Sequence, residues 1–500
     1  MGATRLPSYS PEPTPAMSCV RWRWSGLRPR RVPTRRDIGQ VTITLGFFVL
    51  GLAVGVSSLT FNWVLEHRST SNYFPEFAGR VVYLSDILVI AGISICLAGR
   101  FLARSERLRL GPWYVAAPLF TLLALSALSV LWAADPSQAA IAAERRVWLL
   151  GLYVAAVNGS GKALVPMVIA LFGVGLLQAG VALAQVALGG PTGLTMLGEI
   201  PKDAHFYTAI GQPRALGLGF SPNPPAMYLA VVGSLAYGVL LLLRGGFWVK
   251  ALTFATFAAT FSGMMATGSR AALLGCMLAI VVVTALSWLS KGGLRGLITR
   301  RGWVAVPLMV AVFVLVPYLV YTSAEESVLS RVSPTHYLTD LRGRFREIEL
   351  SGPIIRDNLL LGVGAQNYPQ EIKARVAPNR LGGGFVPVHN VPALITAEHG
   401  VPGAIVWAVL MIAPFIWFVS AWRHRAFDPR VLLWLGPLVV VFFVSLFEFS
   451  PWATQDGRVM LWALIGLWAG SWSHTGSPVP IDQRRPQPDT APENPVRSVG

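Results

Sequence analysis

The stretch "VPVHNVPALITAEHGVPGAIVWAVLM", residues 386–411, leads from a polar segment into a long apolar run. About 20 apolar residues are enough for a helix to cross the hydrocarbon core of a bilayer. The stretch therefore predicts a membrane-spanning helix that starts next to His389 and Asn390 and is broken around Gly400-Val401-Pro402. Polar groups at the edge of a bilayer are costly unless they have partners there. The side of the membrane on which His389 lies thus becomes the first question.

The composition is that of a membrane protein. Of the 500 residues, 53% are hydrophobic and 13% are charged, whereas soluble domains carry about 25% charged residues. The net charge of +17 would suggest a nucleic-acid partner in a soluble protein. Here the arginines cluster between apolar runs, which is how membrane topology is encoded, so we expect no nucleic-acid partner. The three cysteines form no CxxC pair, which argues against a disulfide framework or a zinc site.

Apolar runs recur along the whole chain. They predict an all-α polytopic membrane protein with about 12 transmembrane helices. The run at 140–157 fits least well, because Glu144, Arg145 and Arg146 stand near its start. The runs are 38–61, 81–98, 113–133, 140–157, 163–188, 226–243, 249–267, 271–290, 303–321, 391–421, 431–448 and 459–473.

The charges of the loops predict the orientation. Positive residues concentrate on the cytoplasmic side of membrane proteins, and four basic clusters fall on one side if all twelve runs span: residues 1–37, 100–109, 291–301 and 422–430. Both termini are therefore expected in the cytoplasm. The long segments 62–80, 189–225 and 322–388 then face outward, so that His389 lies on the extracytoplasmic face.

Three parts follow from this topology. Residues 1–37 are a basic, disordered cytoplasmic tail, residues 38–473 the transmembrane domain, and residues 474–500 a second disordered cytoplasmic tail. We expect the outer loops 189–225 and 322–390 to carry the functional site. The second of these lies between helices 9 and 10 and contains an amphipathic helical stretch, "LRGRFREIELSGPIIRDNLL".

Several kinds of site are missing from the sequence. It contains no HExxH, GxxxxGK[ST] or GxSxG motif. The acidic pair Glu325-Glu326 in the outer loop has no neighbouring Asp or His and is more simply a solvated charge pair. We therefore expect chemistry that needs no metal and no cofactor.

Three arginines stand where apolar runs meet the outer face. Arg270 lies at the outer end of a run among small residues, Arg344 lies on the amphipathic stretch, and Arg214 precedes the Asn-Pro turn at Asn223. Each has a plainer explanation: an interfacial anchor for Arg270, a solvated helix face with acidic partners for Arg344, and a loop-rim residue for Arg214.

His389 is the candidate for proton transfer, because a neutral imidazole at the head of a span can accept a proton near neutral pH. A structural histidine is the alternative. Asn390 follows it directly. Glu398 is nine residues further along the same helix and about half a turn out of phase, so it is expected to orient the helix rather than to pair with His389.

Four segments together resemble the O-antigen ligase and polymerase superfamily of the Wzy_C type. They are "GLGFSPNPPAMYLA" (217–230), "SRAALLG" (269–275), "GRFREIELSGPIIRDNLLLGVGAQNYP" (343–369) and "HNVPALITAEHGVPGAI" (389–405). Members are inner-membrane glycosyltransferases with a GT-C-type fold. They take a glycan from an undecaprenyl-diphosphate carrier on the periplasmic side.

The resemblance implies a role for each candidate. Arg270 and Arg344 resemble the arginines that hold the donor diphosphate, and His389 is similar to the essential loop histidine of the family. The acceptor would be lipid A–core in a ligase, and a second carrier-linked repeat in a polymerase. Arg214 is expected to bind the donor diphosphate with these two arginines, and Asn223, Asn390 and Glu398 are expected to support the site. The alternatives are a Wzy-type polysaccharide polymerase, or a multi-pass transporter or flippase, which would carry ionisable residues near the middle of the bilayer.

Overall fold

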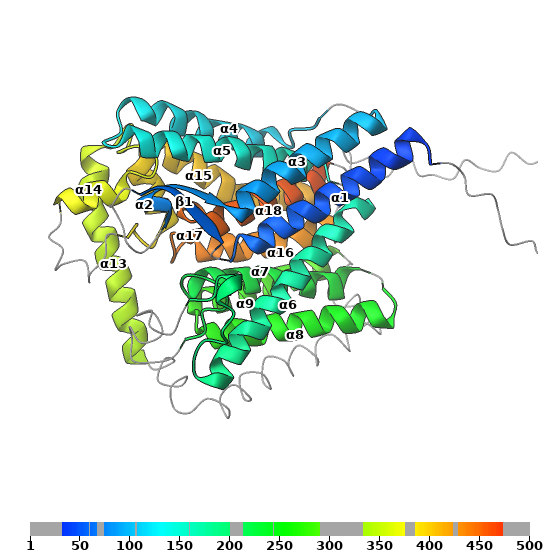
Figure 1. Ribbon diagram of the computed structural model, residues 1–500. Helices are drawn as coiled ribbons and strands as arrows, with labels where there is room; N and C mark the ends of the chain where they lie inside the picture. Colours follow the sequence, from blue (N-terminus) through cyan, green and yellow to red (C-terminus); the bar gives the residue numbers. More distant parts are fainter. Residues whose placement is uncertain are drawn as a thin grey trace, which may run out of the picture.

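The computed structural model describes residues 33–59, 61–67, 75–105, 108–159, 161–200, 214–243, 245–290, 334–375, 386–423 and 429–473. Most of them are helical, and the helices lie side by side in one bundle (Figure 1). The elements are α1 (Arg35–Val56), β1 (Asn62–His67), α2 (Pro75–Ala78), β2 (Gly79–Tyr83), α3 (Leu84–Ala103), α4 (Trp113–Leu128), η1 (Ser129–Leu131), α5 (Pro136–Val157), η2 (Gly161–Leu164), α6 (Val165–Leu188), η3 (Thr195–Leu197), α7 (Asn223–Leu242), α8 (Phe247–Thr267), α9 (Arg270–Ser290), α13 (Pro334–Asp357), α14 (Tyr368–Arg375), α15 (Val391–Arg423), α16 (Pro429–Val444), α17 (Ser450–Ala453) and α18 (Gln455–Ser473).

Helices occupy every predicted apolar run that falls within the described residues; the run at 303–321 lies outside them. Eight helical segments there are long and apolar enough to cross a membrane, and the helix Val431–Val444 is apolar but shorter. The count of 12 spans remains a prediction. The eight are Arg35–Val56, Leu84–Ala103, Trp113–Leu131, Gly161–Leu188, Asn223–Leu242, Phe247–Thr267, Arg270–Leu289 and Val391–Ala421.

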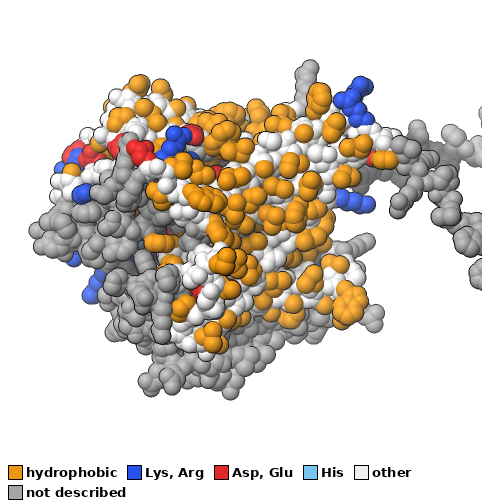
Figure 2. Space-filling model, viewed as in Figure 1, with side chains coloured by type: hydrophobic (Ala, Val, Ile, Leu, Met, Phe, Trp, Pro, Cys, Tyr) orange, Lys and Arg blue, Asp and Glu red, His pale blue; other side chains and the backbone are white. Residues whose placement is uncertain are grey.

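The surface of the bundle is apolar, as expected for a membrane protein. Large side chains such as Phe101, Trp113 and Leu131 are 75–81% exposed. In Figure 2 hydrophobic side chains cover most of the face that is not grey, and charged groups gather toward its ends. A surface of this kind is stable only against lipid, so the chain is a membrane protein with several apolar helices.

The charges in α5 point inward. The Arg145 Nη2 atom donates to the carbonyl oxygen of Val81 at 2.7 Å, and the Arg146 guanidinium lies 4.5 Å from the ring centroid of Trp452. Both arginines are buried in the protein. The two guanidinium charges are therefore stabilised inside the bundle by a carbonyl oxygen and an aromatic ring.

Small residues let α1 and α3 pack closely. A Cβ atom at Gly39 would lie 2.5 Å from the backbone nitrogen of Ala103, and one at Gly46 would lie 2.5 Å from Cys96 Sγ. Close backbone approach at small residues is a main source of helix association in membranes. At the centre of the bundle, α7 packs against α8, α9 and α16, and 83% of the residues in its apolar stretch are buried inside the protein.

One end of the bundle carries the non-spanning elements. In Figure 1 α13, α14, α17 and the antiparallel hairpin β1–β2 gather on the left, whereas α1 begins on the right. The amphipathic stretch predicted around 341–360 forms the second half of α13. The start of α15 lies at the same end as α13, because His389 contacts Glu347.

The break predicted in α15 is present at Gly400, where φ is 66° and ψ is −165°. A Cβ atom there would lie 2.5 Å from the carbonyl oxygen of Leu360, so only glycine fits. The loop 359–364 fills the break and forms three backbone hydrogen bonds with α15. They run from Val363 N to Ala397 O (2.9 Å), from Gly364 N to Glu398 O (3.0 Å) and from Val401 N to Leu359 O (2.8 Å).

Candidate functional site

Asn390 anchors the start of α15. Its Oδ1 atom accepts a hydrogen bond from the backbone nitrogen of Ala393 at 2.8 Å, as an N-cap does. Its Nδ2 atom donates to the carbonyl oxygen of Leu446 at 2.9 Å, in the turn that follows α16. The structure thus gives Asn390 a positioning role: it fixes the start of α15, directly after His389.

His389 pairs with Glu347 of α13. The Nδ1 atom lies 2.7 Å from Glu347 Oε2, and the backbone nitrogen of His389 donates to the same oxygen at 3.1 Å. The ring of Phe449 packs edge-on with a centroid distance of 4.8 Å. When Nδ1–H donates to a carboxylate, the neutral imidazole presents the Nε2 lone pair as an acceptor. This is the arrangement of a general base held by an orienting carboxylate.

Burial raises the pKa of Glu347 to about 7, with the Arg344 guanidinium opposing and the Glu448 carboxylate adding to the rise. The carboxylate therefore changes its charge near neutral pH. On the sequence alone, Glu347 is only one of the acidic neighbours of Arg344 on a solvated helix face. The signal was available, since residues three apart on a helix share a face, and Arg344 and Glu347 both point into the site.

Glu448 connects two of the candidate arginines. Its Oε1 atom accepts a hydrogen bond from Arg344 Nη2 at 2.7 Å and from Asn223 Nδ2 at 2.7 Å. Asn223 Oδ1 in turn accepts from Arg214 Nη2 at 3.3 Å. The Glu448 side chain is 7% exposed and that of Arg344 is 28% exposed. Arg344 thus forms an ion pair with a carboxylate 104 residues away, while Glu347 on its own helix interacts with it through charge.

Glu448 is the second residue that sequence reasoning missed. It closes the apolar run 431–448, and a carboxylate at such a place invites a functional interpretation. Its partners could not be foreseen, because they come from α13 and from the segment 214–223, which are distant in sequence.

Arg214 contacts the turn between α8 and α9, and Arg270 directly follows this turn. The Arg214 Nε atom donates to the carbonyl oxygen of Thr267 at 2.8 Å. Gly268 then ends α8 in the left-handed conformation with φ 65°, and Arg270 opens α9. One candidate arginine, Arg214, therefore contacts the short turn that a second, Arg270, follows, and the network through Asn223 and Glu448 leads from Arg214 to the third.

Glu398 is not part of this group. It is 1% exposed, and its Oε2 atom accepts from Trp452 Nε1 at 3.2 Å. The Arg146 guanidinium lies on the ring of the same tryptophan. The structure thus gives the Glu398 carboxylate a partner on α17.

Among the residues that the structure describes, no group of three or more His, Cys, Asp or Glu side chains could hold a metal ion. Glu325 and Glu326 lie outside these residues. The site is instead made of arginines, amides, a histidine and two carboxylates. Such a set binds an anion through the arginines and can move a proton at the imidazole.

Residues 255–408 match the family model described as Wzy_C, O-antigen ligase. This segment of the chain is similar to the O-antigen ligase family. The resemblance to the O-antigen ligase and polymerase superfamily is confirmed over these residues. The matched segment includes Arg270, Arg344, Glu347 and His389, whereas Arg214, Asn223 and Glu448 lie outside it. No curated protein matches the chain.

Proposed function

We propose that this protein transfers a glycan from an undecaprenyl-diphosphate carrier to an acceptor hydroxyl on the periplasmic face of the inner membrane, as an O-antigen ligase does, and that it needs no metal. One observation carries the proposal. The pair His389–Glu347 lies next to the network that joins Arg344 to Arg214 through Glu448 and Asn223. A base and an anion-binding group thus share one end of the bundle.

The arginines would stabilise the leaving group. When the bond between the anomeric carbon and the phosphate oxygen breaks, that oxygen keeps the electron pair and negative charge develops on the diphosphate. Arginine offers planar, permanently charged donors that match phosphate geometry. Arg344 and Arg214, with Arg270 on the adjoining turn, would replace the metal ion that other phosphate-transfer sites use.

The histidine would activate the acceptor. The oxygen of the acceptor hydroxyl bonds to the anomeric carbon, and its proton goes to Nε2 of His389. Nδ1–H meanwhile keeps its hydrogen bond to the Glu347 carboxylate. The ionised carboxylate stabilises the imidazolium that forms. The proton then leaves to solvent or to the diphosphate, and the charge balance of the site is restored.

Glu448 would hold the arginines before the donor arrives. The positive charges of Arg344 and Arg214 repel each other, and the buried carboxylate of Glu448 between them offsets this repulsion. The diphosphate brings its own negative charge. Its oxygens can accept hydrogen bonds from the guanidinium N–H groups that Glu448 does not use. The Arg344 Nη1 atom is one such donor, since it has no hydrogen-bond partner among the described residues.

Two experiments test the proposal. Reporter fusions after residues 109, 250 and 430 should signal the cytoplasm, and fusions within 189–225 and 322–388 the periplasm. A cytoplasmic signal from 322–388 would refute the mechanism, because Arg344 would face the wrong compartment. Analysis of surface glycans in a deletion strain then separates the two reactions: lipid A–core without any attached glycan means a ligase, and cores that carry a single repeat mean a polymerase.

A further inference from the structure

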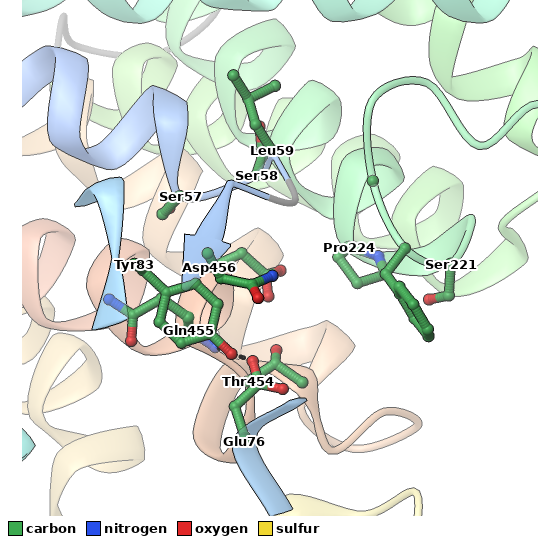
Figure 3. Close-up of a pocket in the computed structure, with 13 residues that line it drawn as sticks. Ser57, Ser58, Leu59, Glu76, Tyr83, Ser221, Pro224, Thr454, Gln455 and Asp456 are labelled. Carbon is green, nitrogen blue, oxygen red and sulfur yellow. Dashed lines mark hydrogen bonds between the residues drawn. The ribbon is translucent and has the colours of Figure 1, made fainter. Parts of the chain in front are cut away.

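A hollow lies beside the arginine network, on the other side of the segment that carries Asn223. It is bounded by the end of α1, by the hairpin β1–β2 with α2, by residues 219–224 and by the start of α18 (Figure 3). Its volume is about 50 Å³. A water molecule needs roughly 10–15 Å³ on this scale, so the hollow has room for a few oxygen atoms. We call it the outer pocket.

The lining of the outer pocket presents hydrogen-bond acceptors. The hydroxyl of Ser57 donates to the carbonyl oxygen of Val54 at 2.7 Å, and the hydroxyl of Thr454 donates to that of Ser450 at 3.0 Å. The protons of both hydroxyls are thus used inside the protein, and their oxygens keep lone pairs. A ligand that fits this wall must bring its own donors.

One carboxylate oxygen in the wall lacks a partner. Asp456 is 8% exposed, and its Oδ2 atom has no hydrogen-bond partner among the residues that the structure describes. A buried acceptor left unsatisfied is costly. Two neighbouring side chains are paired: Glu76 Oε1 accepts from the Gln455 backbone at 2.9 Å, and Gln455 Nε2 donates to Asp86 at 2.6 Å. The hydroxyl of Tyr83, which also lines the pocket, has no hydrogen-bond partner among the described residues. Asp456 is therefore the charged group in the pocket that a ligand would complete, with the Tyr83 hydroxyl as a second polar contact.

The position of the outer pocket relates it to the reaction. Ser221 and Pro224 line it, while Asn223 between them donates to Glu448. On the opposite wall, the short helix α17 connects Thr454 to Phe449, whose ring packs on His389. One segment of chain thus separates the pocket from the arginine network, and a single helical turn separates it from the histidine.

We propose that the outer pocket binds the hydroxyl-bearing edge of one sugar ring, with Asp456 as its principal acceptor. This inference rests on the proposed function, because it assigns the substrate class of the same site. Adjacent ring hydroxyls bring several O–H donors at fixed spacing, which suits a carboxylate flanked by hydroxyl oxygens. The ring belongs either to the glycan of the donor or to the acceptor saccharide, which share this chemistry.

A direct binding test does not require turnover. The probe is the set of oligosaccharide fragments released by mild acid from the surface polysaccharides of the host, and the protein is the full chain in lipid nanodiscs. Saturation-transfer NMR on the wild type should mark the protons of one ring. Ser221→Leu, which fills the pocket, should abolish the transfer, and Ser221→Ala, which does not, should retain it. An unmarked wild type, or equal signals from both variants, would overturn the proposal and leave a pocket that holds water only.

A second measurement identifies the source of the ring. Asp456→Asn keeps the shape but removes the charge, and should weaken the interaction roughly tenfold or more. If the ring belongs to the donor, the variant binds glycan-bearing undecaprenyl diphosphate more weakly and bare undecaprenyl diphosphate normally. If it belongs to the acceptor, the KM for the acceptor rises and donor binding stays. Equal weakening of the bare carrier would overturn the assignment.

These outcomes separate the two proposals. If the wild type binds no undecaprenyl diphosphate, the proposed transferase function fails, yet the NMR test of the outer pocket still stands. If the carrier binds and the oligosaccharides give no signal, only the sugar subsite fails.

Discussion

Glu347 Oε2 lies 2.7 Å from His389 Nδ1 and accepts a hydrogen bond from the His389 backbone nitrogen at 3.1 Å. The carboxylate therefore fixes the ring and the backbone together, and so selects both the tautomer and the direction of Nε2. Two residues 42 positions apart in the sequence thereby form one hydrogen-bonded unit.

The first prediction concerns pH. Because burial places the Glu347 pKa at about 7, the carboxylate is ionised above that pH and neutral below it. Turnover should therefore fall as the pH drops through about 7, where the imidazolium loses its counter-charge. Glu347→Gln should be slow at every pH and should shift this inflection, because only the His389 imidazole of the pair then titrates, while Glu349→Gln on the exposed face of α13 should keep the wild-type profile. Turnover across pH 5–9 is the measurement; an unchanged inflection in Glu347→Gln would contradict the role.

The second prediction concerns the arginines. Arg344→Lys keeps the charge and the ion pair with Glu448 but loses the forked donor, so donor binding should weaken by about 1.5–3 kcal/mol, or roughly 10- to 150-fold. Arg270→Lys should act in the same direction. Arg346→Lys is the matched control, because its side chain lies on the exposed face of the same helix. Calorimetry with the lipid diphosphate decides; equal affinities for Arg344→Lys and Arg346→Lys would remove Arg344 from the donor site.

The third prediction separates the histidine from the arginines. His389→Ala should leave the affinity for the donor unchanged and reduce turnover by about 10²–10⁴-fold, the range for loss of a general base. Donor affinity and single-turnover rates report the two effects independently. A loss of donor binding would instead make His389 a ligand-holding residue.

The fourth prediction concerns metals. Transfer by the purified protein should survive EDTA, because arginines rather than a divalent ion face the leaving group in the proposed mechanism. Activity that disappears in EDTA and returns with magnesium or manganese would refute the metal-free mechanism. Glu66 and the pair Glu325-Glu326 would then be the residues to substitute.

The fifth prediction concerns stability. Gly400→Ala places a Cβ atom 2.5 Å from the Leu360 carbonyl oxygen in a backbone conformation that favours glycine. We expect a loss of about 2 kcal/mol or more in the free energy of unfolding. Gly352→Ala in α13 is the control, since a Cβ atom there meets nothing within 4 Å, and it should be neutral or slightly stabilising. Thermal unfolding in nanodiscs gives the comparison.

Much of the helical framework could be predicted from hydrophobic runs, because the length of such a run is set by the bilayer. His389 could be singled out because a polar residue at the head of a span is unusual, and Arg344 because it lies on an amphipathic stretch. The two carboxylates that organise them were missed. Glu448 is paired with residues 104 and 225 positions away, and such pairing depends on how helices pack rather than on any local pattern. The same holds for Arg145 and Arg146, whose charges weakened the predicted span although they turn inward.

The three backbone bonds between loop 359–364 and the break in α15 fix a chain length. Inserting or removing one residue between Asn358 and Gly364 would shift every donor past its acceptor. Because this loop follows α13 directly, such a shift would displace α13 along α15. Glu347 of α13 would then move away from His389, which precedes α15. Related proteins that keep this site should therefore tolerate substitutions on the exposed face of α13, while the number of residues from Glu347 to Gly364 stays constant.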